Sequence, residues 1–495
     1  MSLAQVGNSE KSKRERKRFR PAAEPAGDRA QLPADWRERF KLLLPTEVLQ
    51  DIACRCGALD VRERKLPCVV FFWAMVLVLS QDGPVWLSSI ASQVSVACIL
   101  AGWEMQGRGL SKQAISDNLT RRPWGFFAAV FKYLWSCYAL QVGGPWVGVE
   151  SVRQLDILLV DATVLRVACG LAQRFPTYAT PRSTSWAALQ LHSRLAVMHG
   201  LPEVVALTTV KTDELSVEFL RQAGELVLYV FDLGYWCYAL YDEIMDRRQQ
   251  FLSRLKAGSN PLIKAVYVGE SSWVGKRLKE VELVGDQVDL LVNLTCAKAT
   301  ANARRKPRQT LAQRRQVKGH QRTTYMDHDV RLVGQWQAAK QRWFLYITSL
   351  VDPQTYPIDF ICDLYRARWQ IEIFFRDLKQ VLGMRNFIAR SENGICIQVY
   401  AAMLFYLLTQ VVIAQAAKET GRSVDDFSTP YCLNVVRMVL TQATPSLLTG
   451  ASTADVDRLE RMLIDAVIAQ GLRPNRRRPV ILTTIRKTLP QAEAA

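Results

Sequence analysis

Apolar and polar positions follow two different spacings along the chain, and the change in spacing divides it into segments. From about residue 36 to Gly143 the spacing is helical, with Pro67 ahead of an apolar run at 68–79 and a polar-fronted segment, SKQAISDNL, at 111–119. After Gly143 and Gly144 the apolar runs become short, as is typical of strands. The predicted strands are 155–160, 191–198, 204–210 and 226–231. A helical region followed by a sheet is therefore expected.

Later segments complete a mixed α/β pattern. Helices are predicted at 213–223, 235–250, 361–382 and 395–417, and strands at 251–255 and 343–349. Between residues 258 and 342, short alternating runs at 262–268, 275–284 and 288–294 predict a β-rich insertion. The chain then ends in a helical region with a basic tail.

Two apolar runs are long enough to be considered as membrane spans. The run at 68–79 is too short, and the run at 399–417 is interrupted by Thr409, Gln410 and Gln415. The first twenty residues are basic and contain no secretory signal. We therefore expect buried core helices in a cytoplasmic protein with no membrane partner.

The charge of the chain points to a polyanionic partner. Lys and Arg total 64 against 46 Asp and Glu, which gives a net charge of +18. Residues 298–322 carry basic side chains and no acid, including Arg304, Arg305, Arg314 and Arg315. Such a stretch is either a solvated loop or a surface that follows DNA phosphates, and the lack of counter-charge favours the second interpretation.

The segment at 111–119 has a second interpretation. It resembles a helix-turn-helix fragment, with Lys112, Gln113, Asn118, Arg121 and Arg122 available to DNA. An ordinary capped helix explains the same residues.

Four polar residues in the predicted helix at 361–382 share one face. Tyr365, Arg368, Glu372 and Lys379 stand at offsets of 0, 3, 7 and 14 residues, which places them in a stripe roughly 60° wide. An i, i+4 surface salt bridge between Arg368 and Glu372 would explain part of this pattern.

Two aspartates end apolar strands of the predicted sheet. Asp161 follows LDILLV and begins the sequence DAT, and Asp232 follows LVLYVF and begins DLGY. A strand-end aspartate is commonly a turn or cap residue. Together with Glu372, however, the two can hold two divalent cations about 4 Å apart, as in-line phosphoryl transfer requires.

These motifs resemble those of the DDE transposases of bacterial insertion sequences. The resemblance rests on DAT at Asp161, DLGY at Asp232 and the spacing Y-x2-R-x3-E-x6-K from Tyr365. It implies an RNase H-like mixed-sheet catalytic core interrupted by a β-rich insertion, with helical N- and C-terminal regions. It also implies that Asp161, Asp232 and Glu372 are catalytic and bind two Mg²⁺ ions per active site, for which Mn²⁺ can substitute.

The resemblance also assigns DNA contacts. Tyr365, Arg368 and Lys379 are expected to hold phosphates at the transposon end, and a tryptophan near the end of the insertion to stack on a flipped base. Trp343 is the best match and Trp336 is a rival, although a tryptophan that opens a strand is often a core residue.

The expected protein binds transposon ends, cleaves them and transfers the 3′-hydroxyls to target DNA. Its partners are double-stranded DNA and a second copy of the chain, in the bacterial cytoplasm at the nucleoid. The alternatives are an RNase H-like nuclease without strand transfer, a catalytically inactive DNA-binding descendant and, least compatible with these motifs, a membrane protein.

The predicted domains are a basic tail (1–35), a helical DNA-binding domain (36–150), the first part of the core (151–257), the insertion (258–342), the second part of the core (343–420) and a helical C-terminal region (421–495).

Overall fold

The structure, a computed structural model, describes most of the chain between residues 44 and 473. The described ranges are 44–59, 66–78, 86–100, 109–142, 156–177, 187–197, 200–211, 214, 217–295, 326–380, 383–384, 387–448 and 453–473. The predicted basic tail at 1–35 lies outside these ranges. So does the basic stretch at 298–322, with Arg304, Arg305, Arg314 and Arg315.

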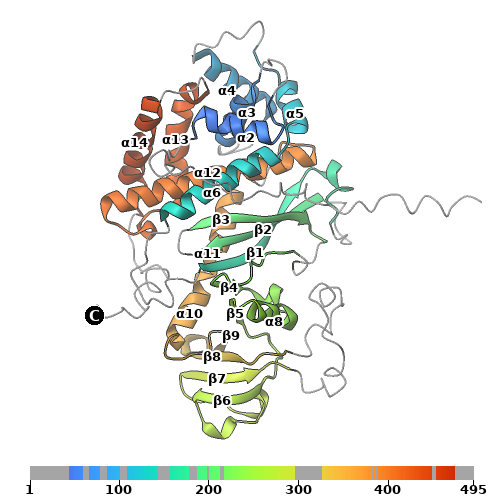
Figure 1. The fold of residues 1–495 in the computed structure, drawn as a ribbon, viewed down its shortest axis with the longest axis vertical. Coiled ribbons are helices and arrows are strands. Elements are labelled where there is room, and N and C mark those ends of the chain that lie inside the picture. The colour runs from blue at the N-terminus through green and yellow to red at the C-terminus, as the bar shows by residue number, and fades with distance from the viewer. Residues whose placement is uncertain are drawn as a thin grey trace, which may run out of the picture.

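Helices from both halves of the chain pack into one bundle around the long helix α12 (Glu392–Thr420), at the top of Figure 1. The N-terminal members are α2 (Thr46–Arg55), α3 (Cys68–Val78), α4 (Leu87–Leu100), α5 (Lys112–Arg121) and α6 (Gly125–Val142). The C-terminal members are α13 (Thr429–Leu448) and α14 (Thr453–Gln470). The two helical regions expected at the two ends of the chain therefore share a core.

Helix α12 is a core helix. The Ser391 hydroxyl caps its start by accepting from the Gly394 N–H, and Gly421, at φ +61°, ends it. It is long and apolar enough to cross a membrane, but 89% of its most apolar window is buried inside the protein. The prediction of a buried helix at 395–417 is confirmed.

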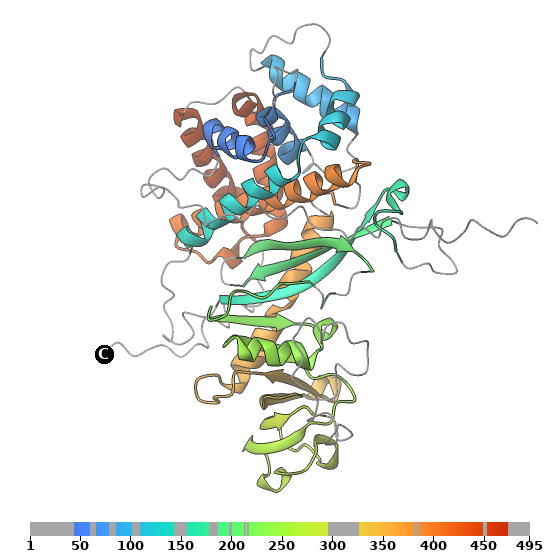
Figure 2. The ribbon, with the colours of Figure 1, turned by 45° about the vertical axis from the view of Figure 1, so that its right-hand side comes forward.

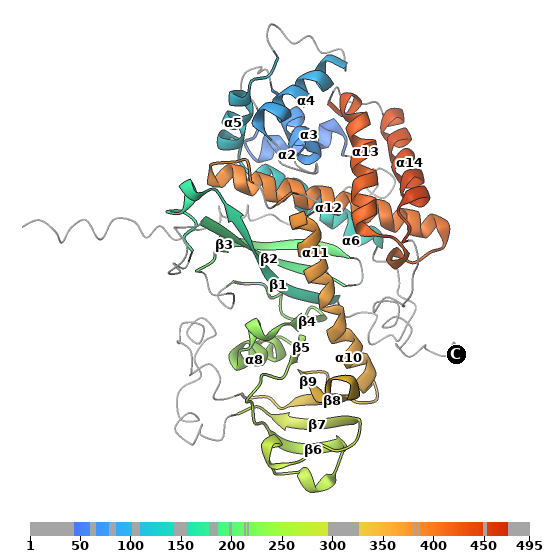
Figure 3. The same ribbon diagram turned by 180° about the vertical axis from the view of Figure 1, so that it is seen from behind.

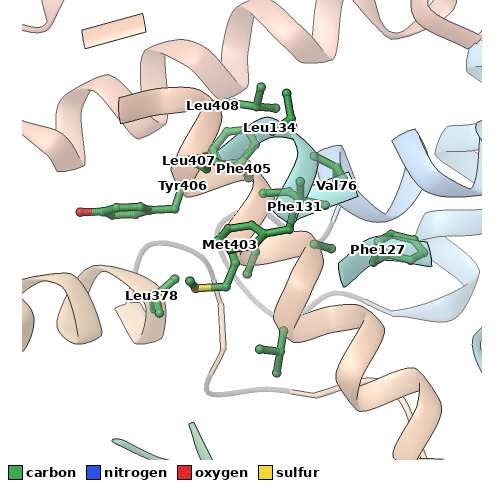
Figure 4. Close-up of a cluster of buried hydrophobic side chains, with 14 of the residues drawn as sticks. Val76, Phe127, Phe131, Leu134, Leu378, Met403, Phe405, Tyr406, Leu407 and Leu408 are labelled. Atoms are coloured by element: carbon green, nitrogen blue, oxygen red, sulfur yellow. The ribbon is translucent and has the colours of Figure 1, made fainter. Parts of the chain in front are cut away.

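The core continues from the bundle to the sheet. Figure 4 shows side chains of α12 gathered with side chains from three other helices in one buried cluster. The labelled side chains are Met403, Phe405, Tyr406, Leu407 and Leu408 of α12, Val76 of α3, Phe127, Phe131 and Leu134 of α6, and Leu378 of α11 (Trp369–Gln380). Since Leu159 and Val230 of the sheet belong to the same buried cluster, the bundle and one face of the sheet are packed as a unit.

The segment that resembled a helix-turn-helix fragment is the capped helix α5. The Ser111 hydroxyl accepts from the Ala114 N–H at 3.2 Å. Arg122 is only 5% exposed and donates to the carbonyls of Ala58 (2.8 Å) and Leu66 (2.7 Å). The expectation that Arg122 is available to DNA is therefore wrong, because its guanidinium ties α5 to the preceding segments.

The nine described strands form one mixed sheet in the order β3-β2-β1-β4-β5-β9-β8-β7-β6 (Figures 1 and 2). Strand β4 pairs in parallel with β1 and with β5, and every other pair of neighbouring strands is antiparallel. Their bounds are β1 Asp156–Val167, β2 Ala187–Ala196, β3 Leu201–Thr209, β4 Val227–Phe231, β5 Gln250–Arg254, β6 Leu262–Val268, β7 Gln287–Asn293, β8 Val330–Gln337 and β9 Arg342–Thr348. The predicted α/β class with an RNase H-like mixed sheet is confirmed.

Helices cover the two faces of this sheet. Helices α10 (Ile358–Ala367) and α11 cross one face, which Figure 3 shows from behind, and α8 (Tyr238–Asp246) lies on the other. Alternate residues of each strand consequently enter different cores: Leu159 and Val230 face α11, whereas Val160 and Phe231 belong to the cluster around α8.

The β-rich insertion extends the same sheet through the pairing of β8 with β9. Two details differ from the expectation. Strand β8 was not predicted, because the buried Arg331 interrupts its apolar run. The strand predicted at 275–284 is instead a 3-10 turn, Leu278–Glu280, that follows Gly275 at φ +84°.

A buried ion pair fixes β8 against β7. The Arg331 side chain is fully buried and donates to both carboxylate oxygens of Asp289, at 2.7 and 2.6 Å, and to the carbonyl of Tyr356 at 2.7 Å.

Replacing Asp289 with alanine leaves a buried guanidinium uncompensated and is expected to lower the free energy of unfolding by about 3–5 kcal/mol. Chemical denaturation would measure the loss. Asp246→Ala, which removes the exposed partner of His328, should cost less than about 1 kcal/mol; equal losses would contradict this account.

Candidate active site

Two acidic side chains emerge side by side where β1 and β4 stop pairing. The last parallel partners are Val160 and Phe231, so Asp161 and Asp232 occupy the next positions on adjacent strands. Strand β1 does not end at Asp161, as the sequence suggested, but continues to Val167 because β2 still pairs with it. By the alternation of the strands, both aspartates are on the side of Leu159 and Val230, which faces α11.

The helical segment opposite these aspartates is broken at Arg368. A single helix was expected over 361–382, but α10 ends at Ala367 and α11 begins at Trp369. At the break the Arg368 N–H donates to the Tyr365 carbonyl (3.1 Å), a tighter turn than an α-helix makes. Tyr365 and Glu372 therefore belong to different helices, with Arg368 at the junction.

Arg368 links the predicted signature residues. Its Nη2 donates to Glu372 Oε1 at 2.6 Å, and its guanidinium carbon lies 5.9 Å from the centre of the Tyr365 ring. The guanidinium also interacts electrostatically with Asp161. The side chain is 14% exposed, and its buried Nε finds no acceptor among the described residues. Arg368 thus supplies positive charge, and an unused donor, beside the acidic pair.

Glu372 is turned toward Arg368. In the described part of the chain, no three His, Cys, Asp or Glu side chains converge closely enough to hold one metal ion. The structure brings Asp161 and Asp232 together and places Glu372 nearby on α11, paired with the arginine. Lys379 lies in the last turn of the same helix.

The acidic pair has the character of a cation site. The pKa of Asp161 is raised to about 7, mainly by burial and also by the negative charges of Asp232 and Glu214, while the Ala162 N–H and Arg368 act in the opposite direction. Asp232 Oδ1 accepts from the Gly234 N–H at 2.7 Å. A Cβ at Gly234 would stand 2.9 Å from that oxygen and 3.1 Å from Glu214 Oε2. Only glycine therefore lets both carboxylates lie this close to the backbone. Partly buried carboxylates whose charges repel one another suit a divalent cation.

The raised pKa of Asp161 predicts a pH effect in metal-free protein. Because the folded-state pKa is about 7 and that of an unfolded aspartate about 4, protonation stabilises the fold at low pH. This contribution is complete below about pH 4 and is lost as pH rises through 7, at no more than about 1.4 kcal/mol per pH unit. Thermal unfolding in a chelator should therefore show Asp161→Asn gaining stability over wild type between pH 5 and 8. A pH-independent difference would contradict the prediction.

A second group of residues continues along the same face of the sheet. Arg254 of β5 and Tyr346 of β9 lie toward Tyr365, whose ring centre is 4.7 Å from that of Tyr346. The Phe344 ring is approached by three cations: Arg342 at 4.6 Å, Lys340 at 5.4 Å and Arg254 at 5.7 Å. We call Arg254, Lys340, Arg342 and Phe344 the cationic platform. Its like charges suit a polyanion.

Trp343 lies on the opposite face of the sheet. It packs with Leu345 in the cluster around α8, and its ring centre is 5.8 Å from that of Trp336, its partner across β8 and β9. The structure therefore does not bring either tryptophan to Tyr365, and the aromatic residue of β9 that shares the face of Tyr346 is Phe344.

Three residues near the site were not predicted. Arg254 and Phe344 stand in strands that were predicted, but a side chain's face depends on the register of the sheet. Glu214 follows β3 within a segment expected to be helical, whereas the described residues at 217–223 contain no helix. In the sequence, Glu214 stands three residues after Lys211 and belongs to no motif that indicates a functional site.

The order of the strands and the two adjacent aspartates define an α/β protein with an RNase H-like catalytic core. The model of the transposase DDE domain family matches residues 153–408, slightly more than half of the chain. The protein belongs to this family of DNA-acting transposases.

Individual relatives agree with the family. The chain is 28% identical to the transposase y4zB of Sinorhizobium fredii over 61% of this chain and 71% of the relative. It is 25% identical to a transposase for insertion sequence element IS5377 of Geobacillus stearothermophilus, over 54% of this chain and 60% of the relative. A shorter match, 36% identical over 66 residues, is to a transposase for insertion sequence element IS4SA of Synechocystis. The recognition of an insertion-sequence transposase from the sequence motifs is confirmed.

Proposed function

We propose that this protein binds the ends of an insertion sequence, cleaves them and transfers the resulting 3′-hydroxyls to target DNA. The observation that carries the proposal is the placement of Asp161 and Asp232 side by side beneath the Arg368–Glu372 pair. Acids at adjacent positions of two interior strands, with a basic group beside them, can bind a phosphodiester and a cation in the same place.

The catalytic carboxylates in this proposal are Asp161, Asp232 and Glu372, which would hold two Mg²⁺ ions, or Mn²⁺ in their place. The ions supply Lewis acidity for both the attacking and the leaving oxygen. In cleavage, a water oxygen bonds to phosphorus at the end of the element, the bond from phosphorus to the 3′-oxygen breaks, and that oxygen takes up a proton. In joining, the 3′-oxygen loses its proton, bonds to a target phosphorus and displaces the 3′-oxygen of a target nucleotide.

Glu372 must leave Arg368 before it can serve with the aspartates. A DNA phosphate offers Arg368 a substitute partner, and the unused Nε provides a second donor for a bidentate contact. Arg368 would in this way exchange its ion pair with Glu372 for a contact with the DNA phosphate. Glu372 would then be free to bind a cation when DNA is present. In this proposal the three carboxylates adopt their catalytic arrangement only when both a divalent cation and DNA are bound.

The proposed DNA path runs over the face that holds these residues. Tyr365, Arg368 and Lys379 would hold phosphates near the scissile bond, and the cationic platform would hold the neighbouring part of the same strand. The basic stretch with Arg304, Arg305, Arg314 and Arg315 is proposed to add phosphate contacts, and Trp343 stays a candidate only for DNA that reaches the opposite face. Because two ends must be joined, we propose a homodimer on DNA, at the bacterial nucleoid.

The test uses purified full-length protein, Mg²⁺, a labelled duplex that carries the element's terminal repeat, and a supercoiled target. Nicking at the repeat boundary followed by joining is the expected result. Nicking without joining, at any concentration of target, would indicate a nuclease of the same fold. Binding without nicking would indicate a catalytically inactive descendant. Either outcome would overturn the proposal.

A further inference from the structure

We infer that Arg254 binds the phosphate at which the transposon end is cut, beside the two aspartates of the strands. This inference rests on the proposed function and deepens it. It takes one residue of the cationic platform and places it on the reacting phosphate rather than on the neighbouring DNA. Arg254 would then act in the chemical step, whereas Lys340 and Arg342 would hold the strand.

The first support is the alignment of Arg254 with the acidic pair across three neighbouring strands. Val230 of β4 pairs in parallel with Leu252 of β5. Two residues further along, Asp232 and Arg254 hold equivalent positions, as Asp161 and Asp232 do on β1 and β4. Since Val230 and Leu252 belong to the core that includes α11, Arg254 starts from the same face of the sheet as the acids. Its backbone is one strand spacing, about 4.8 Å, beyond that of Asp232.

The second support is the unused hydrogen-bonding capacity of the Arg254 guanidinium. The side chain is partly buried, and its guanidinium carbon lies 5.7 Å from the centre of the Phe344 ring. In the part of the chain that the structure describes, the guanidinium has no acidic or carbonyl acceptor. Arg368, by contrast, already donates to Glu372. A partly buried arginine without an acidic partner suits an anion, and its planar fork matches two oxygens of a phosphate.

The electrostatic surroundings place Arg254 near the residues already assigned to the site. The pKa of the Tyr365 hydroxyl is raised mainly by burial. The charge of Asp232 adds to this shift, and the charges of Arg368 and Arg254 act against it. The Tyr365 ring also packs against that of Tyr346, which is the partner of Arg254 across β5 and β9. One hydroxyl therefore lies within electrostatic range of an acid of the site and of both arginines.

The two arginines differ in their state before DNA binds. Arg368 can take a phosphate only by giving up Glu372, whereas Arg254 has no such partner to exchange. Arg254 can therefore receive the phosphate first. During the displacement the phosphate oxygens carry the negative charge of the transition state, and a guanidinium fixed beside them stabilises that charge. Arg254 itself forms and breaks no covalent bond.

The first test compares DNA binding with single-turnover cleavage by the full-length protein, on the duplex that carries the terminal repeat. Arg254→Gln is expected to lower the cleavage rate at saturating DNA by about a hundredfold or more, and to weaken binding by no more than about tenfold. Arg254→Lys keeps the charge but not the fork, and should recover part of the rate. Both variants should unfold close to the wild-type temperature.

The matched control is Arg458→Gln, which removes an exposed cation from α14 and lowers the net charge by the same amount. It should bind and cleave the duplex as wild type does. If Arg254→Gln lost no more in cleavage than in binding, Arg254 would belong to the DNA-binding surface only and the inference would be overturned.

The second test identifies the phosphate with a duplex whose scissile phosphate is replaced by an uncharged methylphosphonate. In a chelator, which prevents cleavage, Arg254→Gln should weaken binding of the normal duplex by about threefold to tenfold and leave binding of the substituted duplex unchanged. Arg342→Gln, which removes an exposed cation of the platform, should weaken binding of both duplexes. Equal weakening of both duplexes by Arg254→Gln would overturn the inference. Wild-type protein that failed to bind and cleave the normal duplex would overturn the proposed function as well.

Discussion

Replacing Glu372 with glutamine is expected to reduce cleavage of the transposon end by at least about a thousandfold. The amide keeps the shape of the side chain but loses the charge that a divalent cation requires. Binding of the same DNA should change little, or become slightly tighter, since Arg368 is released from its carboxylate partner and keeps its own charge. A gel-shift titration and a single-turnover cleavage assay on one preparation would measure both quantities.

The matched control for this variant is Glu243→Gln. Glu243 pairs with Arg247 at 2.5 Å, with the same i, i+4 spacing, but on α8 and away from the acidic pair. The control should cleave DNA at close to the wild-type rate. If both variants lost activity to the same extent, the loss would come from breaking an ion pair on a helix rather than from loss of a catalytic group. Full activity of Glu372→Gln would show that Glu372 is not part of the active site.

The sequence predicts the acidic pair well because few structural steps separate the residues from their positions. An apolar run that ends in an acid predicts a buried strand, and parallel neighbours place equivalent positions together, as Asp161 and Asp232 are. The contact between Arg368 and Glu372 follows from a local spacing, and it survives the break between α10 and α11 because both residues remain in helical turns.

The remaining features depend on information that is not local. Phe344 and Trp343 are neighbours in the chain, and only the register of β9 against β8 decides which of them faces Tyr346 and Tyr365. Strand β8 itself was missed because the charge of Arg331 is compensated by Asp289, a partner 42 residues away in the chain. Glu214 is brought to Asp232 by a contact with Gln190 on another strand.

Phe344→Ala is expected to weaken both DNA binding and cleavage by roughly tenfold to a hundredfold. The ring holds Arg254, Lys340 and Arg342 together on the face of the sheet that carries Tyr365, and each cation–π contact contributes about 0.5–1 kcal/mol where it is exposed. Without the ring, the cations lose a common support and a base loses a surface for stacking. The measurement is the DNA dissociation constant as a function of salt, together with the cleavage rate at saturating DNA.

Trp343→Ala supplies the contrast, because the two substitutions remove neighbouring aromatic rings from opposite faces of one strand. Trp343 packs against Gly334 and the cluster around α8, so its loss should lower the free energy of unfolding by about 2 kcal/mol or more. Its folded fraction should bind DNA as tightly as wild type does. If Trp343→Ala instead lost DNA binding at unchanged stability while Phe344→Ala behaved as wild type, DNA would have to lie on the α8 face. The cationic platform would then have no part in the reaction.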